Sequence, residues 1–144
     1  MADSAGLTER LRATPEQIVD VLGAAELYPQ WQGGVLSTEV LERDDTGRAT
    51  LVTLHVDAKI KRISYTARYF YDLSAGRVGF DLVEGDLQEV TGRYRLRPRA
   101  DGTTDVTMNI TTEVGFYVPG PMKRMIRDQA LKGSMRDLKR RVEG

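Results

Sequence analysis

The sequence contains no cysteine and only one histidine among its 144 residues. The absence of cysteine excludes a disulfide framework and thiolate chemistry, and it fits a protein kept in a reducing compartment. A single histidine cannot build a typical structural zinc site, which needs several nitrogen or sulfur ligands. We therefore expect neither a metal site nor a cofactor.

An excess of one charge and long hydrophobic runs are also missing. The 21 basic side chains balance 21 acidic ones, so no global charge attracts nucleic acid. No segment approaches the roughly 18 consecutive apolar residues of a membrane span. Residues 1–12 have no basic start followed by an apolar run, so they do not predict a signal peptide. We expect a soluble cytoplasmic protein without a nucleic-acid partner.

A capping signal marks the first helical part of the sequence. Thr14 suits the N-cap, Pro15 the first helical position, and Gln17 completes a capping box. Residues 24–31 then predict a second short helical turn. This turn should stop near Pro29, because proline disfavours helix in the residue before it.

Six later segments alternate between apolar and polar residues, which indicates strands with one buried and one solvated face. Short turns join them, so they predict an antiparallel meander. A further strand over residues 7–12, before the first helix, is the open alternative that would make seven. The six segments are residues 35–42, 49–58, 61–73, 76–84, 87–98 and 104–114.

Residues 118–144 predict one long helix that begins near Pro121. Its apolar residues recur at helical spacing, roughly on one face, which should bury against the sheet. They are Met122, Met125, Ile126, Leu131, Met135, Leu138 and Val142.

The same helix is basic, with eight lysines and arginines against three acidic residues between residues 122 and 143. The simpler interpretation is a solvated face whose cations complement the helix dipole near the C-terminus. The alternative is a transient contact with an anionic membrane surface or an acidic protein.

These elements predict an α+β fold in one domain over residues 1–144. A curved antiparallel sheet of six to seven strands surrounds the long C-terminal helix, with two short helices after the first strand. A twisted sheet cannot bring every strand into contact with a helix about 10–12 Å wide. A space should remain between them, and this space predicts an internal cavity.

Six stretches carry a resemblance that covers nearly the whole chain: ATPEQIVDVLGAAELYPQW, VLERDDTGRAT, YTARYFYD, VGFDLVEGD, GRYRLRPRADGTTDVT and VPGPMKRM. Together, and in this order, they resemble the polyketide cyclase/dehydrase and lipid-transport family, within the START and birch-pollen-allergen-like superfamily. The resemblance implies the helix-grip fold. That fold hosts ligand carriers, cyclases, hydrolase-like enzymes and protein-interaction modules, so it does not by itself assign an activity.

We expect side chains from the inward strand faces, the second short helix and the last helix to line the cavity. Repeated inward tyrosines favour a cavity with polar points over a dry core, because a buried hydroxyl needs a partner. Methionines suit a surface that repacks around varied ligands. Ordinary core packing is the alternative for the methionines and for the tryptophan. The predicted lining residues are Trp31, Leu54, Val56, Tyr65, Tyr69, Phe80, Tyr94, Met108, Ile110, Met122 and Met125.

No residue has the pattern of a catalytic group. His55 should face outward from its strand, and no nucleophile motif accompanies it. Five arginines fall on the predicted outer face of the sheet, where solvated side chains are the ordinary finding. They are Arg62, Arg68, Arg93, Arg95 and Arg97.

The favoured hypothesis is binding or transport of a hydrophobic or amphipathic small molecule, such as a lipid, an isoprenoid quinone or a polyketide. One alternative is a polyketide cyclase, aromatase or dehydratase, for which Tyr65, Tyr69 and Tyr94 are the candidate acid–base groups. The other is a protein-interaction module of the same fold, which would act through its basic helix and have a small pocket.

Overall fold

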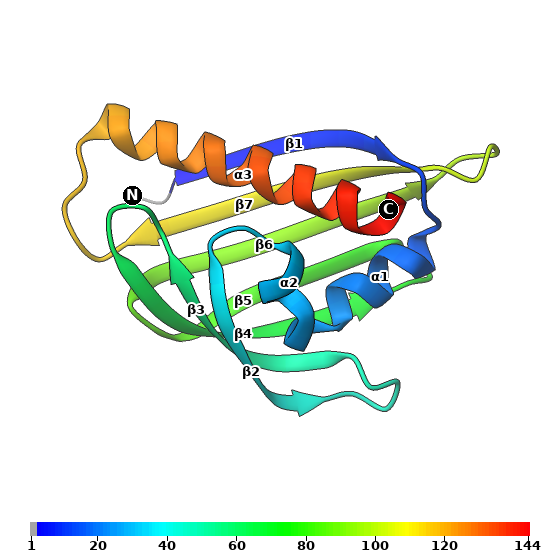
Figure 1. Ribbon diagram of the computed structural model, residues 1–144, viewed down its shortest axis with the longest axis horizontal. Coiled ribbons are helices and arrows are strands. Elements are labelled where there is room, and N and C mark those ends of the chain that lie inside the picture. The colour runs from blue at the N-terminus through cyan, green and yellow to red at the C-terminus, as the bar shows by residue number, and fades with distance from the viewer. Residues whose placement is uncertain (1–2) are drawn as a thin grey trace.

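Seven antiparallel strands form one sheet in the computed structural model, which describes residues 3–144. The order across the sheet is β1-β7-β6-β5-β4-β3-β2. From β2 to β7 each strand therefore lies next to the following strand in sequence, and β1 adds to the far edge beside β7. Figure 1 shows the sheet curving around one long helix, which confirms the predicted fold class. The strands are β1 (Asp3–Leu11), β2 (Val35–Arg43), β3 (Ala49–Asp57), β4 (Arg62–Asp72), β5 (Arg77–Gly85), β6 (Leu87–Pro98) and β7 (Thr104–Val114).

The first strand exists, but it begins earlier than the predicted residues 7–12. Its pattern is weakly apolar because its outward side chains are polar and pair with β7. The Ser4 hydroxyl lies 2.9 Å from that of Thr111, and the Thr8 hydroxyl lies 2.8 Å from that of Thr107. Such cross-strand hydroxyl pairs stabilise a sheet without adding to the hydrophobic pattern.

The helices are α1 (Pro15–Gly23), the 3₁₀ turn η1 (Ala25–Leu27), α2 (Tyr28–Trp31) and α3 (Gly120–Glu143). The capping box of α1 is present: the backbone N–H of Gln17 donates to the Thr14 hydroxyl at 3.2 Å. The prediction that helix stops near Pro29 is wrong, because this proline lies in the first turn of α2. A first-turn residue needs no intrahelical N–H partner. No helix described within residues 3–144 is long and apolar enough to cross a membrane.

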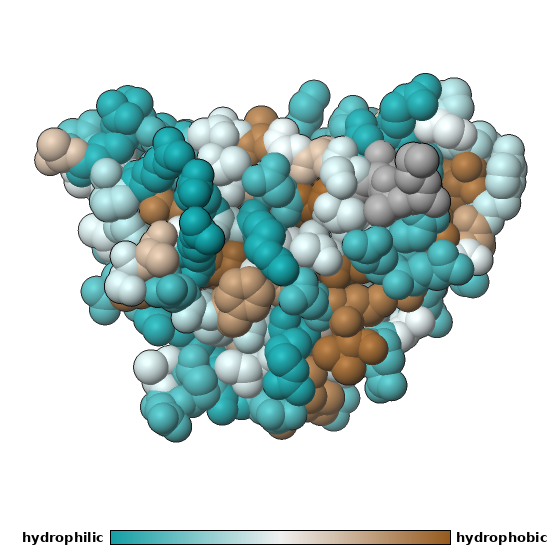
Figure 2. Space-filling view, turned by 180° about the vertical axis from the view of Figure 1, so that it is seen from behind, coloured by the Kyte–Doolittle hydropathy of each residue, from teal (hydrophilic) through white to brown (hydrophobic). Residues whose placement is uncertain are grey.

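Helix α3 crosses the concave face of the sheet, and the two halves of the helix differ in burial. Leu131, Met135 and Leu138 in the C-terminal half are at most 5% exposed. In the N-terminal half, Met122 is 42% and Met125 52% exposed. The opposite side of the molecule, seen in Figure 2, presents mainly hydrophilic side chains.

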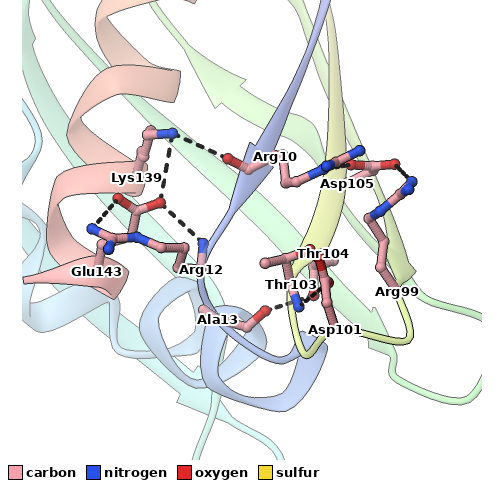
Figure 3. A network of polar contacts seen from close by, with 10 residues as sticks. All are labelled: Arg10, Arg12, Ala13, Arg99, Asp101, Thr103, Thr104, Asp105, Lys139 and Glu143. Atoms are coloured by element: carbon pink, nitrogen blue, oxygen red, sulfur yellow. Dashed lines mark hydrogen bonds and ion pairs between the residues drawn. The ribbon is translucent and has the colours of Figure 1, made fainter.

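Polar contacts fix the C-terminal end of α3 to the strand β1 (Figure 3). The Glu143 carboxylate accepts the backbone N–H of Arg12 at 3.0 Å and its guanidinium at 3.3 Å. Lys139 lies 3.6 Å from the same carboxylate and donates to the backbone carbonyl of Arg10 at 3.1 Å. These contacts, together with the buried apolar residues, anchor one end of α3.

We expect Met135→Ala to destabilise the protein by about 2–4 kcal/mol, because it removes a fully buried side chain from the anchored half of α3. Met125→Ala is the matched control on the same helix. It should change the free energy of unfolding by less than about 0.5 kcal/mol, since that side chain is half exposed. Equilibrium urea denaturation measures both, and equal losses would contradict the difference between the two halves.

We expect Glu143→Gln to destabilise the protein at neutral pH and to lose this effect in acid. The backbone N–H of Arg12 and the charge of Lys139 hold the pKa of Glu143 below its usual range. The contribution of the carboxylate is therefore present above the unfolded-state pKa and is lost as the pH falls through the folded-state pKa.

The measurement is the difference in free energy of unfolding between wild type and variant, from about pH 7 to below about pH 4. Glu39→Gln removes an exposed carboxylate from β2 and serves as the control. A difference for Glu143→Gln that stays constant across this range would exclude the proposed role of the carboxylate.

Candidate functional site

A cavity of about 850 Å³ lies between α3 and the concave face of the sheet. Its floor consists of inward side chains from β3 to β7, and Ile126, Ala130 and Gly133 of α3 form part of its roof. Gly33 and Gly34, between α2 and β2, lie at its rim. The cavity exists because α3 packs mainly along β1, at one edge of the sheet, and leaves the inward faces of β3 to β6 uncovered.

The structure places seven of the eleven predicted lining residues on the cavity surface. All seven come from strands, where alternation determines which side chains face inward. They are Leu54, Val56, Tyr65, Tyr69, Phe80, Tyr94 and Ile110. The other four, among the residues that the structure describes, do not line it: Trp31, Met108, Met122 and Met125.

Tyr28 lines the cavity, and Trp31 packs against Tyr28 without lining the cavity itself. The Trp31 ring packs edge-on against Tyr28, with centroids 5.6 Å apart. Tyr28 in turn contacts Tyr69, whose ring lies 5.1 Å from that of Phe80. Gly92 of β6 gives the Phe80 ring its space, because a Cβ at that position would collide with the ring. The aromatic row therefore runs from α2 across β4 to β5.

The three methionines fail to line the cavity for two reasons. Met108 is 1% exposed and packs in the core, where its strand neighbours in register are Leu7 and Tyr94. Met122 and Met125 are both exposed. Met122 lies on the same face as Ile126 but in the first turn of α3, whereas Met125 lies on a different face. Successive helical residues differ by about 100° around the axis, so Met125 points well away from the direction of Ile126.

A smaller apolar extension of about 170 Å³ continues from the main cavity beneath the N-terminal half of α3. The two spaces share lining residues, among them Ile63, Ile110 and Ala130. At its outer end the extension reaches Ile60 in the β3–β4 turn and Val118 in the β7–α3 connection.

The tyrosine side chains supply polar groups inside an otherwise apolar space. Burial raises the pKa of Tyr65 to about 12, and it raises the pKa of Tyr69 and Tyr94 well above their usual range. The Tyr28 hydroxyl donates to the carbonyl of Leu22. The hydroxyls are therefore neutral at physiological pH, where they donate and accept hydrogen bonds but do not act as bases.

Two of these hydroxyls have no protein partner. Within residues 3–144 no hydrogen bond joins the hydroxyl of Tyr65 or Tyr94 to another side chain or to the backbone. Both tyrosines line the cavity. Because buried hydroxyls normally have a partner, these two are the polar points that a bound molecule would satisfy.

Within residues 3–144, the charged side chains of the cavity lining come from α3, from the last residue of β3 and from the turn after it, and all except Asp137 are exposed. The carboxylate of Asp137, which is 8% exposed, accepts the backbone N–H of Gly33 at 2.8 Å and ties α3 to the α2–β2 loop. Asp57, Lys59 and Arg136 are further rim residues. The deeper lining therefore favours an uncharged molecule.

The sequence analysis missed two kinds of feature at this site: several lining residues on strands, and a contact between distant segments. Ile63, Leu87 and Val90 belong to the predicted strands, and their alternation would have identified them. No local pattern signals the contact between Asp137 and Gly33, which are 104 residues apart.

The remaining candidate groups lie outside the cavity. His55 is exposed on β3, with its Nδ1 atom 2.6 Å from the Ser64 hydroxyl. Within residues 3–144, no three histidine, aspartate or glutamate side chains are grouped to hold a metal ion. All five arginines predicted on the outer face are exposed: Arg62, Arg68, Arg93, Arg95 and Arg97.

Residues 6–143 match the family described as "Polyketide cyclase / dehydrase and lipid transport". No curated protein sequence matches the chain. Among the solved structures that share the fold, three that are each below 25% identical to this chain illustrate the similarity.

A START superfamily protein from Mycobacterium smegmatis has a TM-score of 0.85 and 24% identity, with 97% of both chains covered. An aromatase/cyclase from Streptomyces sp. R1128 has a TM-score of 0.83 and 14% identity, covering 99% of this chain and 94% of its own. A protein from Thermus thermophilus has a TM-score of 0.83 and 20% identity, with 97% of both chains covered.

The raised tyrosine pKa values predict that the protein loses stability in alkali. A group whose folded-state pKa lies above its unfolded value, about 10 for tyrosine, contributes stability below that pH. For Tyr65 this contribution is lost as the pH rises towards about 12.

We expect Tyr65→Phe to reduce this alkaline loss by up to about 3 kcal/mol. Urea denaturation of both proteins over a series of pH values measures it. Identical pH dependence for wild type and variant would show that the Tyr65 phenol is not desolvated.

Proposed function

The chain belongs to the polyketide cyclase/dehydrase and lipid-transport family, and on this premise we propose that its cavity binds a hydrophobic or amphipathic small molecule, as a carrier. The observation that supports this most is the cavity of about 850 Å³. Its size suits a small-molecule site, since such sites span about 300–1,000 Å³.

The space opens to solvent at its rim, so without a ligand it fills with water. A closed and empty cavity of even about 300 Å³ would cost roughly 7 kcal/mol, at about 24 cal/mol per Å³. A whole domain is stable by only about 5–15 kcal/mol. The space is therefore occupied by water or by a ligand, and the apolar lining favours a ligand over water.

The lining also defines the class of ligand. The aromatic row and the apolar extension match a mainly hydrocarbon molecule, whose burial contributes roughly 25 cal/mol per Å². The free hydroxyls of Tyr65 and Tyr94 match one or two oxygen atoms, such as carbonyl or hydroxyl groups. Lipids, isoprenoid quinones and polyketides all have this composition.

Two alternative functions have less support from the site. An acid–base enzyme needs a group whose pKa lies near the working pH, whereas the pKa values of Tyr65, Tyr69 and Tyr94 are all raised further from it. A module that acts only through protein contacts has no need of a cavity this large. The similarity to an aromatase/cyclase concerns the fold and carries no residue role.

Binding of the neutral fluorescent probe N-phenyl-1-naphthylamine tests the proposal. We expect the wild type to bind it, and Ile110→Trp to weaken binding at least about ten-fold, a loss of about 1.4 kcal/mol. Ile110 lines both the main cavity and its extension, so an indole there fills the space where they meet.

Ile110→Val is the matched control, which keeps the space open and should retain binding. Urea denaturation must show both variants folded. Native mass spectrometry of protein purified from its own host should then reveal retained small molecules. Wild-type protein without probe affinity, or Ile110→Trp that binds as well as wild type, would overturn the proposal.

A further inference from the structure

Two segments meet at the end of the molecule where the apolar extension reaches the surface. One consists of the β3–β4 turn and the first two residues of β4, residues 58–63. The other runs from the β7–α3 connection into α3, residues 115–127. Lys61 lies 5.2 Å over the ring of Phe116, which joins the two. The two segments lie at the same end of the molecule in Figure 1. We call residues 58–63 and 115–127 the entrance surface.

The entrance surface exposes four large apolar side chains. Tyr117 is 89% exposed, the highest fraction among the exposed large apolar residues, and Met125 is 52% exposed. Ile60 and Met122 are 47% and 42% exposed. Single exposed apolar residues are ordinary, but a group at one end of a protein indicates a contact.

The charge of the entrance surface is of one sign. Its two segments contain six basic residues and no acidic residue, although the whole chain has a formal net charge of zero. The basic residues are Lys59, Lys61, Arg62, Lys123, Arg124 and Arg127. Acidic side chains next to these segments accept hydrogen bonds or pair with a cation. Asp57 accepts the backbone N–H of Lys59 at 2.9 Å, Asp86 accepts that of Ser64 at 2.8 Å, and Asp128 pairs with Arg127 at 3.0 Å.

We propose that the entrance surface docks on an anionic lipid bilayer. Apolar side chains ringed by lysine and arginine match the boundary between acyl chains and anionic headgroups. The outer end of the apolar extension, at Ile60, Val118 and Lys123, belongs to the same surface. A docked protein therefore presents this opening to the membrane. The docking itself requires no bound ligand.

Insertion is tested by placing an indole at the most exposed position. Tyr117→Trp should shift its fluorescence to the blue when vesicles of equal parts phosphatidylcholine and phosphatidylglycerol are added. Val83→Trp, at a position 53% exposed on β5, is the matched control and should show no shift. The native Trp31 is present in both proteins and gives the same background.

The charge requirement is tested by co-sedimentation with the same vesicles. We expect K59Q/K61Q/K123Q/R124Q to reduce partitioning at least about a hundred-fold, since each basic residue near the surface contributes roughly five-fold. R77Q/R95Q/R97Q/R141Q removes the same charge from exposed positions elsewhere and should retain most of the binding. Neutral phosphatidylcholine vesicles should not bind the wild type.

Three results would overturn the proposal: no binding of wild type to anionic vesicles, equal losses in the two quadruple variants, or equal blue shifts at positions 117 and 83. Binding to soluble polyglutamate as strong as to vesicles, without a blue shift at position 117, would assign the surface to an acidic protein instead. Probe binding is measured on the same variants, so that a loss of membrane docking can be distinguished from a loss of ligand binding. Ile110→Trp should lose the probe and still bind vesicles.

Discussion

The one-sided anchoring of α3 is the constraint on which the rest of the structure depends. Leu131, Met135 and Leu138 bury the C-terminal half against the sheet, and Glu143 and Asp137 add contacts to β1 and to the α2–β2 loop. No comparable buried residue holds the N-terminal half, where Ile126 is only half-buried. The helix and the curved sheet therefore separate towards that end, where the smaller extension lies. The main cavity lies beside the helix, over the inward faces of β3 to β6, because α3 packs mainly along β1 at one edge of the sheet.

The chemical character of the cavity follows from which elements reach it. Strand side chains provide the aromatic floor, and strand alternation places the tyrosines among apolar neighbours, where desolvation keeps their phenols neutral. Among the charged residues of α3 that line the cavity, Lys132 and Arg136 are exposed at its rim, and the buried Asp137 is bonded to the backbone N–H of Gly33. Hydrogen bonding without charge is thus available inside, and this suits oxygen-bearing hydrocarbons more than ionic metabolites.

The sequence predicted the sheet and its inward residues well, because burial of one face imposes a period of two that local reading detects. Tyr65, Tyr69 and Phe80 were found in this way. Strand β1 was predicted less well, because its outward side chains include hydroxyls whose partners lie on β7, and such pairs leave no apolar pattern in the sequence. Contacts such as Gly33 with Asp137 depend on residues distant in sequence and leave no local pattern.

The rotation of α3 was the main feature that sequence could not decide, and it has the largest consequence. Hydrophobicity alone favoured Met122 and Met125 on the buried side, yet Lys123 and Arg127 line the extension instead. Long basic side chains can cover apolar surface with their methylene stems while their charges reach solvent. With those stems facing inward, the methionines face outward beside a set of cations. The exposed methionines and the basic residues thus occupy neighbouring positions on the same two turns of α3, and together they form the helical part of the entrance surface.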